Sequence, residues 1–324
     1  MLAIKERLFE FLRISRSKIN RLRMQESQRK LAQQKAQQKT AFDSLSVSFD
    51  EKYQQLKKYH LDRYTTPLWK KYNAKLEKIL LPHPPFSFLQ DPMMMMTMFD
   101  TAGGHWLKKE LTFLEKKIAK RRLKLLLKED YVGDPLLLQA AYLTSHTTIR
   151  HLYHLVKFLD VSGCNLTKIK TVIEWGGGYG NLVKILKRLL IKPCTYIIID
   201  TPLLSCLQWL YLSTIFGKEA VHLLSDEKGA IKINKINILP VSLLAKYPIR
   251  GDLFISTWAL SESSKYSQDY VVKHNWFQAK HLLLAYQENE TGLFDPVRVG
   301  KLAADRGAVI QKVEFLPGNH YAFL

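Results

Sequence analysis

Residues 171–186 read TVIEWGGGYGNLVKIL and hold the strongest indication of chemistry in the sequence. An acid, Glu174, precedes four closely spaced glycines, and a second acid, Asp200, ends the next apolar run along the chain. The glycines are Gly176, Gly177, Gly178 and Gly180. Glycine accepts backbone angles that other residues disfavour, and it leaves room for a close neighbour. We therefore interpret the stretch as a tight binding loop with a carboxylate on either side.

From residue 169 onward, short apolar runs alternate with helical patterns, and this alternation must position the loop. Strands are predicted at 169–175, 195–200, 220–224, 251–258 and 281–287, and the last sixteen residues read as a hairpin around Pro317-Gly318. One intervening helix has signals at both ends, with Thr201 as N-cap, Pro202 in the first position and Gly217 just past the end. The pattern predicts an α/β fold, a mostly parallel Rossmann-like sheet with an antiparallel edge. Ligands of such sheets lie outside the carboxyl ends of the strands, where the glycines and acids are expected.

The first half of the chain reads as helical. Residues 1–40 are basic and partly Gln-rich, 45–80 suggest one or two helices, 81–86 form a proline break, and a helix is predicted at 106–128. Another helix begins after Ser145, its expected N-cap. The run MMMMTM at 93–98 is interpreted as core packing, with an adaptable pocket lining as the alternative. We expect a basic helical arm at 1–60, a helical cap or substrate region at 61–143, and a cofactor-binding catalytic domain at 144–324.

The charge is unevenly distributed, which bears on possible partners. The net charge is +20, and residues 1–170 hold 32 lysines and arginines against 16 acids, whereas residues 171–324 hold 17 against 13. A basic half suits anionic lipid, nucleic acid or an acidic carrier, and it equally suits a set of solvated helices. The apolar side of the first helix, with its arginines, suggests contact with a membrane surface as one alternative.

Other features indicate a cytoplasmic location, with the inner membrane face as the alternative site of the basic arm. No apolar run reaches 18 residues, so no membrane-spanning segment is predicted. The first residues lack the pattern of a secretory signal. Cys164, Cys194 and Cys206 show no metal or redox spacing, and their odd number favours reduced thiols.

The glycine spacing distinguishes between two classes of cofactor. In the dinucleotide pattern G-x-G-x-x-G a third glycine would stand at Asn181, and it is missing. The G-x-G-x-G spacing with its acids resembles motif I and the following acid of class I S-adenosylmethionine-dependent methyltransferases. The resemblance implies that Glu174 and the glycines border the methionine part of the cofactor. It also implies that Asp200 accepts hydrogen bonds from the ribose hydroxyls, with Thr201 and Ser256 as further cofactor contacts.

The segment after the predicted fourth strand bears on which chemical group the protein would methylate. It reads STWALSES (256–263) and lacks the D/N-P-P-Y/F motif of enzymes that methylate amino groups of bases or glutamine, so nucleic acid is not the expected substrate. The stretches VGDP, SHTTIRHLYHL, YIIIDTPLLSCLQWLYLSTIFG, STWALSES and GNHYAFL, together with the glycine loop, resemble a family described as sugar O-methyltransferases. This resemblance covers residue 132 to the end and implies methylation of a hydroxyl on a sugar or glycan-linked substrate. The rival hypotheses are an NAD-binding oxidoreductase and a non-catalytic, membrane-apposed protein that keeps the cofactor fold.

Methylation of a hydroxyl requires a group that accepts its proton. The candidates are Glu262, just past the fourth strand, His320, at the start of the last strand, and His105, in a possible lid. Glu262 could instead be a helix N-terminal acid next to Ser261, and His320 a hairpin residue without a catalytic role. Trp258 offers a flat apolar face that suits either a sugar ring or the core.

Two further histidines, His151 and His154, lie three residues apart on one predicted helix. That spacing places both side chains on one side of a helix, where they could share a metal ion. Because no third ligand is apparent, we interpret them as packing residues and predict no metal.

Overall fold

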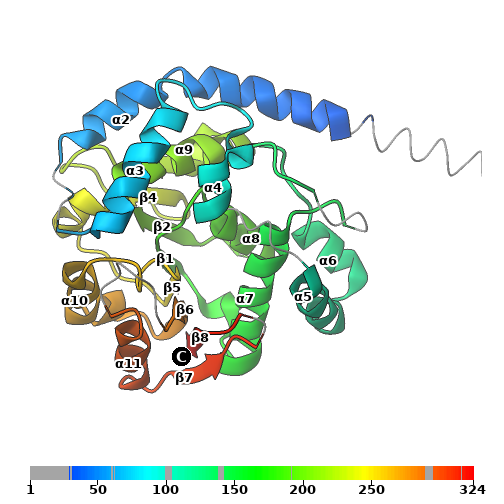
Figure 1. Cartoon of the computed structure of the whole chain (residues 1–324), viewed down its shortest axis with the longest axis vertical. Helices are drawn as coiled ribbons and strands as arrows, with labels where there is room; N and C mark the ends of the chain where they lie inside the picture. The colour runs from blue at the N-terminus through cyan, green and yellow to red at the C-terminus, as the bar shows by residue number, and fades with distance from the viewer. Residues whose placement is uncertain are drawn as a thin grey trace, which may run out of the picture.

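The computed structural model describes residues 29, 31–59, 61, 63–98, 104–137, 142–190, 192–288, 295–314 and 316–324. Its centre is an eight-stranded sheet in the order β3-β4-β2-β1-β5-β6-β8-β7 (Figure 1). The strands are β1 (Thr171–Trp175), β2 (Thr195–Asp200), β3 (Val221–Leu223), β4 (Ile236–Pro240), β5 (Leu253–Thr257), β6 (His281–Gln287), β7 (Val309–Lys312) and β8 (Asn319–Phe323).

The strand order creates a site at the middle of the sheet. β1 pairs in parallel with β2 on one side and with β5 on the other, so the chain leaves β1 in one direction and later returns to its opposite edge. In open α/β sheets this reversal leaves a crevice at the carboxyl ends of the two central strands. β8 pairs antiparallel with both β6 and β7. The predicted Rossmann-like class and the antiparallel C-terminal strand are therefore confirmed.

Helices cover the sheet and follow the predicted signals closely. They are α7 (His146–Ser162), α8 (Asn181–Leu189), α9 (Pro202–Phe216), α10 (Lys265–Lys273) and α11 (Arg298–Ala304). The Ser145 hydroxyl accepts a hydrogen bond from the backbone N–H of Thr148 and caps α7, as predicted. Thr201, Pro202 and Gly217 also take their predicted places around α9. α9 is buried along most of its length because it lies between the sheet and α2 (Phe49–Lys57).

The helices of the N-terminal half pack mainly against the helices that cover the sheet (Figure 1). A helix over 31–46 is followed by α2, α3 (Pro67–Leu80), α4 (Pro92–Thr97), α5 (Gly104–Lys117) and α6 (Lys120–Leu126). Phe42 in the first of these helices is fully buried, and Gln38 both donates to Asp130 and accepts from the backbone N–H of Tyr131. Within the predicted arm, residues 31–46 are therefore attached to the body of the protein. Residues 1–28 lie outside the described part.

A buried ion pair ties this half to the half of the chain that forms the sheet. Lys184 of α8 is completely buried, and its ammonium donates to Glu129 Oε1 at 2.5 Å. Burial alone would raise the pKa of Glu129, but Lys184 and donors from Ser145 hold it at about 2. Ser145 and Thr148 also donate their hydroxyls to Glu129 Oε2, at 2.7 and 2.8 Å, so the carboxylate occupies the start of α7.

The structure corrects two predicted elements. β4 is missing from the predicted strands because lysines precede it and a proline ends it, yet it is buried between β2 and β3. The predicted helix at 106–128 is two helices, α5 and α6, separated by the extended Ala119. The break redirects α6 so that Leu123 and Leu126 become buried.

Candidate active site

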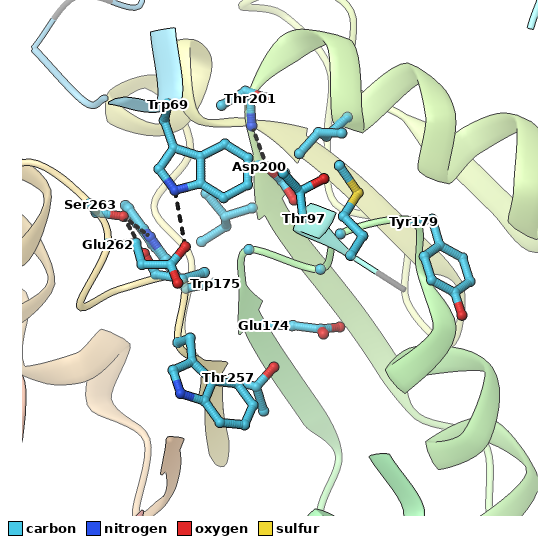
Figure 2. Close-up of a pocket in the computed structure, with 18 of the residues that line it drawn as sticks. Trp69, Thr97, Glu174, Trp175, Tyr179, Asp200, Thr201, Thr257, Glu262 and Ser263 are labelled. Atoms are coloured by element: carbon cyan, nitrogen blue, oxygen red, sulfur yellow. Dashed lines mark hydrogen bonds between the residues drawn. The ribbon is translucent and has the colours of Figure 1, made fainter. Parts of the chain in front are cut away.

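A cavity of about 520 Å³ lies at the carboxyl ends of β1, β2 and β5, where the strand order reverses (Figure 2). It is lined from the sheet by the glycine loop and the segments after β2, β4 and β5, and from the N-terminal half by α3, α4 and α7. The lining residues that bear on its chemistry are Tyr64, Thr65, Trp69, Met95, Met96, Met98, Thr147, Arg150, His151, Glu174, Trp175, Gly176, Gly177, Gly178, Tyr179, Ile199, Asp200, Thr201, Leu204, Val241, Trp258 and Glu262.

Three of the four glycines, Gly176, Gly177 and Gly180, lie close against other parts of the protein, so packing within the protein restricts the residue at these positions. A Cβ on Gly176 would lie 2.0 Å from the Cβ of Ala259, and one on Gly177 would lie 2.6 Å from Ile198 Cγ2. A Cβ on Gly180 would lie 3.1 Å from a leucine of α9, and Gly180 does not line the cavity. These glycines bring the loop close to β2, α9 and the segment after β5.

Gly178 is the glycine whose environment fits a ligand. Its φ is +56°, in the left-handed region, and the atoms nearest to a Cβ there would belong to Met98, at ordinary contact distances from 3.7 Å. The space next to Gly178 therefore belongs to the cavity. A branched side chain would project into it.

The two acids border this loop from adjacent strands (Figure 2). Glu174, at the end of β1, accepts a hydrogen bond of 2.8 Å from the Tyr196 hydroxyl. Asp200, at the end of β2, accepts 2.7 Å bonds from the Thr201 backbone N–H and from Gln208 Nε2. In the described part of the chain, neither carboxylate forms an ion pair with a lysine or arginine.

Burial without a cationic partner makes these carboxyls unusually weak acids. The pKa of Glu174 is raised to about 7, chiefly by burial and further by the charge of Asp200. Burial also raises the pKa of Asp200 to about 7, although hydrogen bonds from Thr201, Gln208 and the glycine-loop backbone oppose the rise. A cation in the cavity would favour the ionised form of both groups. The site therefore has the electrostatics of a receptor for a positively charged ligand.

Raising the pH should destabilise the ligand-free protein. Both carboxyls have pKa values near 7 in the folded protein, against ordinary values of 4.5 and 3.8. Their protonated forms therefore contribute fully to the free energy of unfolding below about pH 4, and this contribution is lost as the pH rises through 7. Between pH 5.5 and 8.5 the loss in the free energy of unfolding should be on the order of 2 kcal/mol for each carboxyl. Glu174→Gln, which still accepts from Tyr196, should flatten this dependence. Thermal unfolding between pH 5.5 and 8.5 measures it, with Glu227→Gln at an exposed carboxylate as control. Equal slopes for wild type and Glu174→Gln would contradict the assignment.

The segment after β5 places one predicted catalytic residue in the cavity. Trp258 takes a left-handed φ of +66°, a conformation that costs free energy for a bulky residue and is most often found at functional sites. Its backbone N–H donates to Ala285 and its indole donates to Asn319 Oδ1, which hold the turn in place. Glu262 follows on this turn and lines the cavity. It is not a capping acid, because α10 begins later, with Ser264 as its N-cap.

Ser256 does not fit its predicted role as a cofactor contact. It is buried, its hydroxyl donates to the Trp175 carbonyl at 3.1 Å, and the same oxygen accepts from the backbone N–H of Leu260. Ser256 thus fastens the segment after β5 to β1 and does not line the cavity. Thr201 does line the cavity, and its contact with a cofactor stays a prediction.

One side of α3, which lies within the predicted cap region at 61–143, covers the cavity. Trp69 Nε1 donates to Glu262 Oε2 at 3.0 Å (Figure 2), and the hydroxyl of the N-cap residue Thr66 donates to the Glu262 carbonyl at 3.4 Å. Two turns further along, Asn73 Oδ1 accepts from the Thr201 hydroxyl at 3.3 Å. α3 therefore spans the cavity from the segment after β5 to the segment after β2.

The methionine run at 93–98 lies beside α3, and its residues belong partly to the core and partly to the cavity lining. Met94 is fully buried and belongs to the core. Met95, Met96 and Met98 line the cavity. Met93, Met95 and Met98 also pack against the core, so each interpretation holds for part of the run. Methionine side chains adapt their shape readily, which suits a wall that must close over a ligand.

The histidines take different places. His320 stacks on Tyr286 and its Nε2 lies 3.3 Å from Glu288 Oε1, away from the cavity lining. The side chain of His105 lies outside the described residues. His154 Nδ1 is 2.7 Å from the Tyr321 hydroxyl, in agreement with a packing role.

His151 lines the cavity, contrary to the packing interpretation. Its Nδ1 lies 3.1 Å from Asn181 Nδ2. Burial, together with the charges of Lys184 and Arg150, lowers its pKa to about 3, so the ring is neutral near pH 7. The sequence signal was present in the helical spacing of Thr147, Arg150 and His151, which places all three on one side of α7.

Metal ligation and membrane crossing find no support among the described residues. Within those ranges, no three His, Cys, Asp or Glu side chains lie close enough to hold a metal ion. No helix among the same residues is both long and apolar enough to cross a bilayer. The three cysteines are buried and unpaired.

No protein-family model matches the chain, and no curated protein sequence does. Among solved structures, it resembles a SAM-dependent methyltransferase from Aquifex aeolicus (16% identity, 65% of this chain and 97% of that one, TM-score 0.36). It also resembles magnesium protoporphyrin IX methyltransferase from Synechocystis PCC 6803 with bound SAH (14%, 66% and 98%, 0.38) and mitomycin 7-O-methyltransferase MmcR (12%, 76% and 74%, 0.38). At this level of similarity the function must be inferred from the cavity itself.

Proposed function

We propose that this protein is an S-adenosylmethionine-dependent methyltransferase that methylates a hydroxyl of a sugar or glycoconjugate. The observation that carries the proposal is the pair of buried carboxyls, Glu174 and Asp200, on either side of the glycine loop at the reversal point of the sheet. S-Adenosylmethionine is a cation with a sulfonium and an ammonium group, and it matches the charge that this site lacks.

The remaining lining fits the other parts of the cofactor. Gly178 leaves open space at the floor of the cavity. Ile199, Leu204 and Val241 supply an apolar wall beside Asp200, which suits a flat heteroaromatic ring. Asp200 can accept hydrogen bonds from ribose hydroxyls because a carboxylate has about four acceptor sites. When bound, the cofactor supplies an electrophilic methyl group, which is the difficult part of the chemistry.

The opposite side of the cavity supports a hydroxyl acceptor. Glu262 provides a carboxylate that can orient a hydroxyl and accept its proton, and Trp69 holds one of its oxygens. Gln287 Nε2 approaches the other oxygen at 3.5 Å. The indoles of Trp69, Trp175 and Trp258 line the same region and offer flat apolar faces for a sugar ring. Sugar specificity rests on these aromatic faces and on the family resemblance of the sequence.

Ligand titration tests the proposed cofactor. S-Adenosylmethionine and S-adenosylhomocysteine should each raise the melting temperature, since a ligand that binds only the folded state at 100 times its Kd stabilises it by about 2.7 kcal/mol. NAD should have no effect, because the loop lacks the third glycine of a dinucleotide site. The affinity for S-adenosylmethionine should increase from pH 6 to 8, since binding favours ionised Glu174 and Asp200. Stabilisation by NAD alone would support the oxidoreductase hypothesis instead.

A further inference from the structure

Arg150 gives the cavity a positive charge at one defined place. Among the described residues that line it, Glu174, Asp200 and Glu262 are acids, and Arg150 is the only lysine or arginine. Its side chain is 15% exposed and comes from α7, together with those of Thr147 and His151. The start of α7 is already occupied by the Glu129 carboxylate, so the positive charge on this wall comes from the arginine.

A buried acid fixes the orientation of Arg150. Its Nε donates to Glu110 Oε1 at 3.1 Å, and Glu110 of α5 is 1% exposed. A guanidinium carries five N–H donors in a rigid plane, so a bond through Nε fixes the direction of its terminal nitrogens. Such a fork matches the geometry of a carboxylate.

Contacts place this wall next to the glycine loop. His151 Nδ1 meets the side chain of Asn181, the residue directly after Gly180, and Thr147 hydrogen-bonds the side chain of Tyr179. Figure 2 shows the Glu174 carboxylate directed toward the side of the cavity where Tyr179 lies. We therefore place the carboxyl of Glu174 and the guanidinium of Arg150 at the same end of the cavity, whereas Asp200 approaches the loop from β2.

We propose that Arg150, supported by His151 and Thr147, binds the α-carboxylate at the amino-acid end of the cofactor. The inference rests on the proposed function and extends it to a residue outside the glycine motif. The amino-acid end of S-adenosylmethionine is a zwitterion, and a charge is bound in a buried site only when it has a partner. Glu174 suits the ammonium group, and Arg150 suits the carboxylate. A neutral His151 that accepts from Asn181 at Nδ1 carries its proton on Nε2 and is then an additional donor.

Two ligands that differ only at the amino-acid end test the proposal. S-Adenosylhomocysteine has the carboxylate, and 5′-methylthioadenosine lacks the whole amino-acid part. Calorimetry would compare Glu110→Gln with the double variant Glu110→Gln/Arg150→Met, so that no buried acid is left unpaired. The second substitution should weaken S-adenosylhomocysteine binding about 10- to 100-fold, the range for a lost charged hydrogen bond, and change 5′-methylthioadenosine binding less than about threefold. Arg150→Lys should show an intermediate loss.

The two ligands also separate the ways in which the proposal could fail. An equal loss for both ligands would mean that Arg150 only maintains the structure, and it would overturn the inference. Unchanged S-adenosylhomocysteine affinity would overturn it as well and would leave Arg150 to an anionic group of the acceptor. If the wild-type protein bound neither ligand, the proposed function itself would be wrong.

Discussion

Gly178→Val should abolish measurable binding of S-adenosylhomocysteine while the protein stays folded. The valine methyl groups would enter the space next to Met98 that we assign to the cofactor. The change should lower binding at least about 100-fold, because a branched side chain is stiff and cannot turn aside. Calorimetric titration of the variant measures the loss.

Gly163→Val is a matched control for this substitution. Gly163 ends α7 with a φ of +64°, close to that of Gly178, and a Cβ on Gly163 would meet no atom within 4 Å. Both variants should lose roughly 1–2 kcal/mol of stability from the left-handed backbone, and only Gly178→Val should lose the ligand. If folded Gly178→Val bound S-adenosylhomocysteine like the control, the cofactor would not lie against this loop.

Glu262→Gln should lower methyl transfer about 100-fold or more and leave the affinity for S-adenosylhomocysteine unchanged. The amide keeps the size of the side chain and can still accept from Trp69, but it cannot take a proton. The assay offers a panel of nucleotide-linked and lipid-linked sugars and follows the formation of S-adenosylhomocysteine. Trp69→Phe, which keeps a ring but removes the donor to Glu262, should cause a smaller loss.

Glu288→Gln provides the comparison for Glu262→Gln. Glu288 is a partly exposed acid next to His320, the other predicted proton acceptor, which does not line the cavity. This variant should retain full activity. Full activity in Glu262→Gln would instead transfer the proton-acceptor role to another residue, such as His105. Firm cofactor binding without turnover on any sugar would point to a different acceptor.

Local patterns were enough to predict the framework of the site. Strand ends, helix caps and the glycine spacing depend on residues within a few positions of one another, so they predict that Glu174, Gly178 and Asp200 lie at one sheet edge. β4 is not predicted from the sequence because the residues before it are rich in lysine and its last residue is a proline, and neither feature is typical of a buried strand. As a consequence Val241, which follows β4, was missed as part of the cavity.

The sequence by itself determined the sheet class, the glycine loop and the two acids, because each of these features depends on residues that are close together in the chain and regularly spaced. Only the tertiary structure decided that Ser256 is a fastening residue, that Arg150 and His151 line the cavity, and that Trp69 meets Glu262 across 193 residues of chain. Contacts of that kind depend on how α3 and α7 pack against the sheet. Because packing depends on how side-chain shapes fit together in three dimensions, the periodicity of the sequence does not predict which distant residues will be in contact.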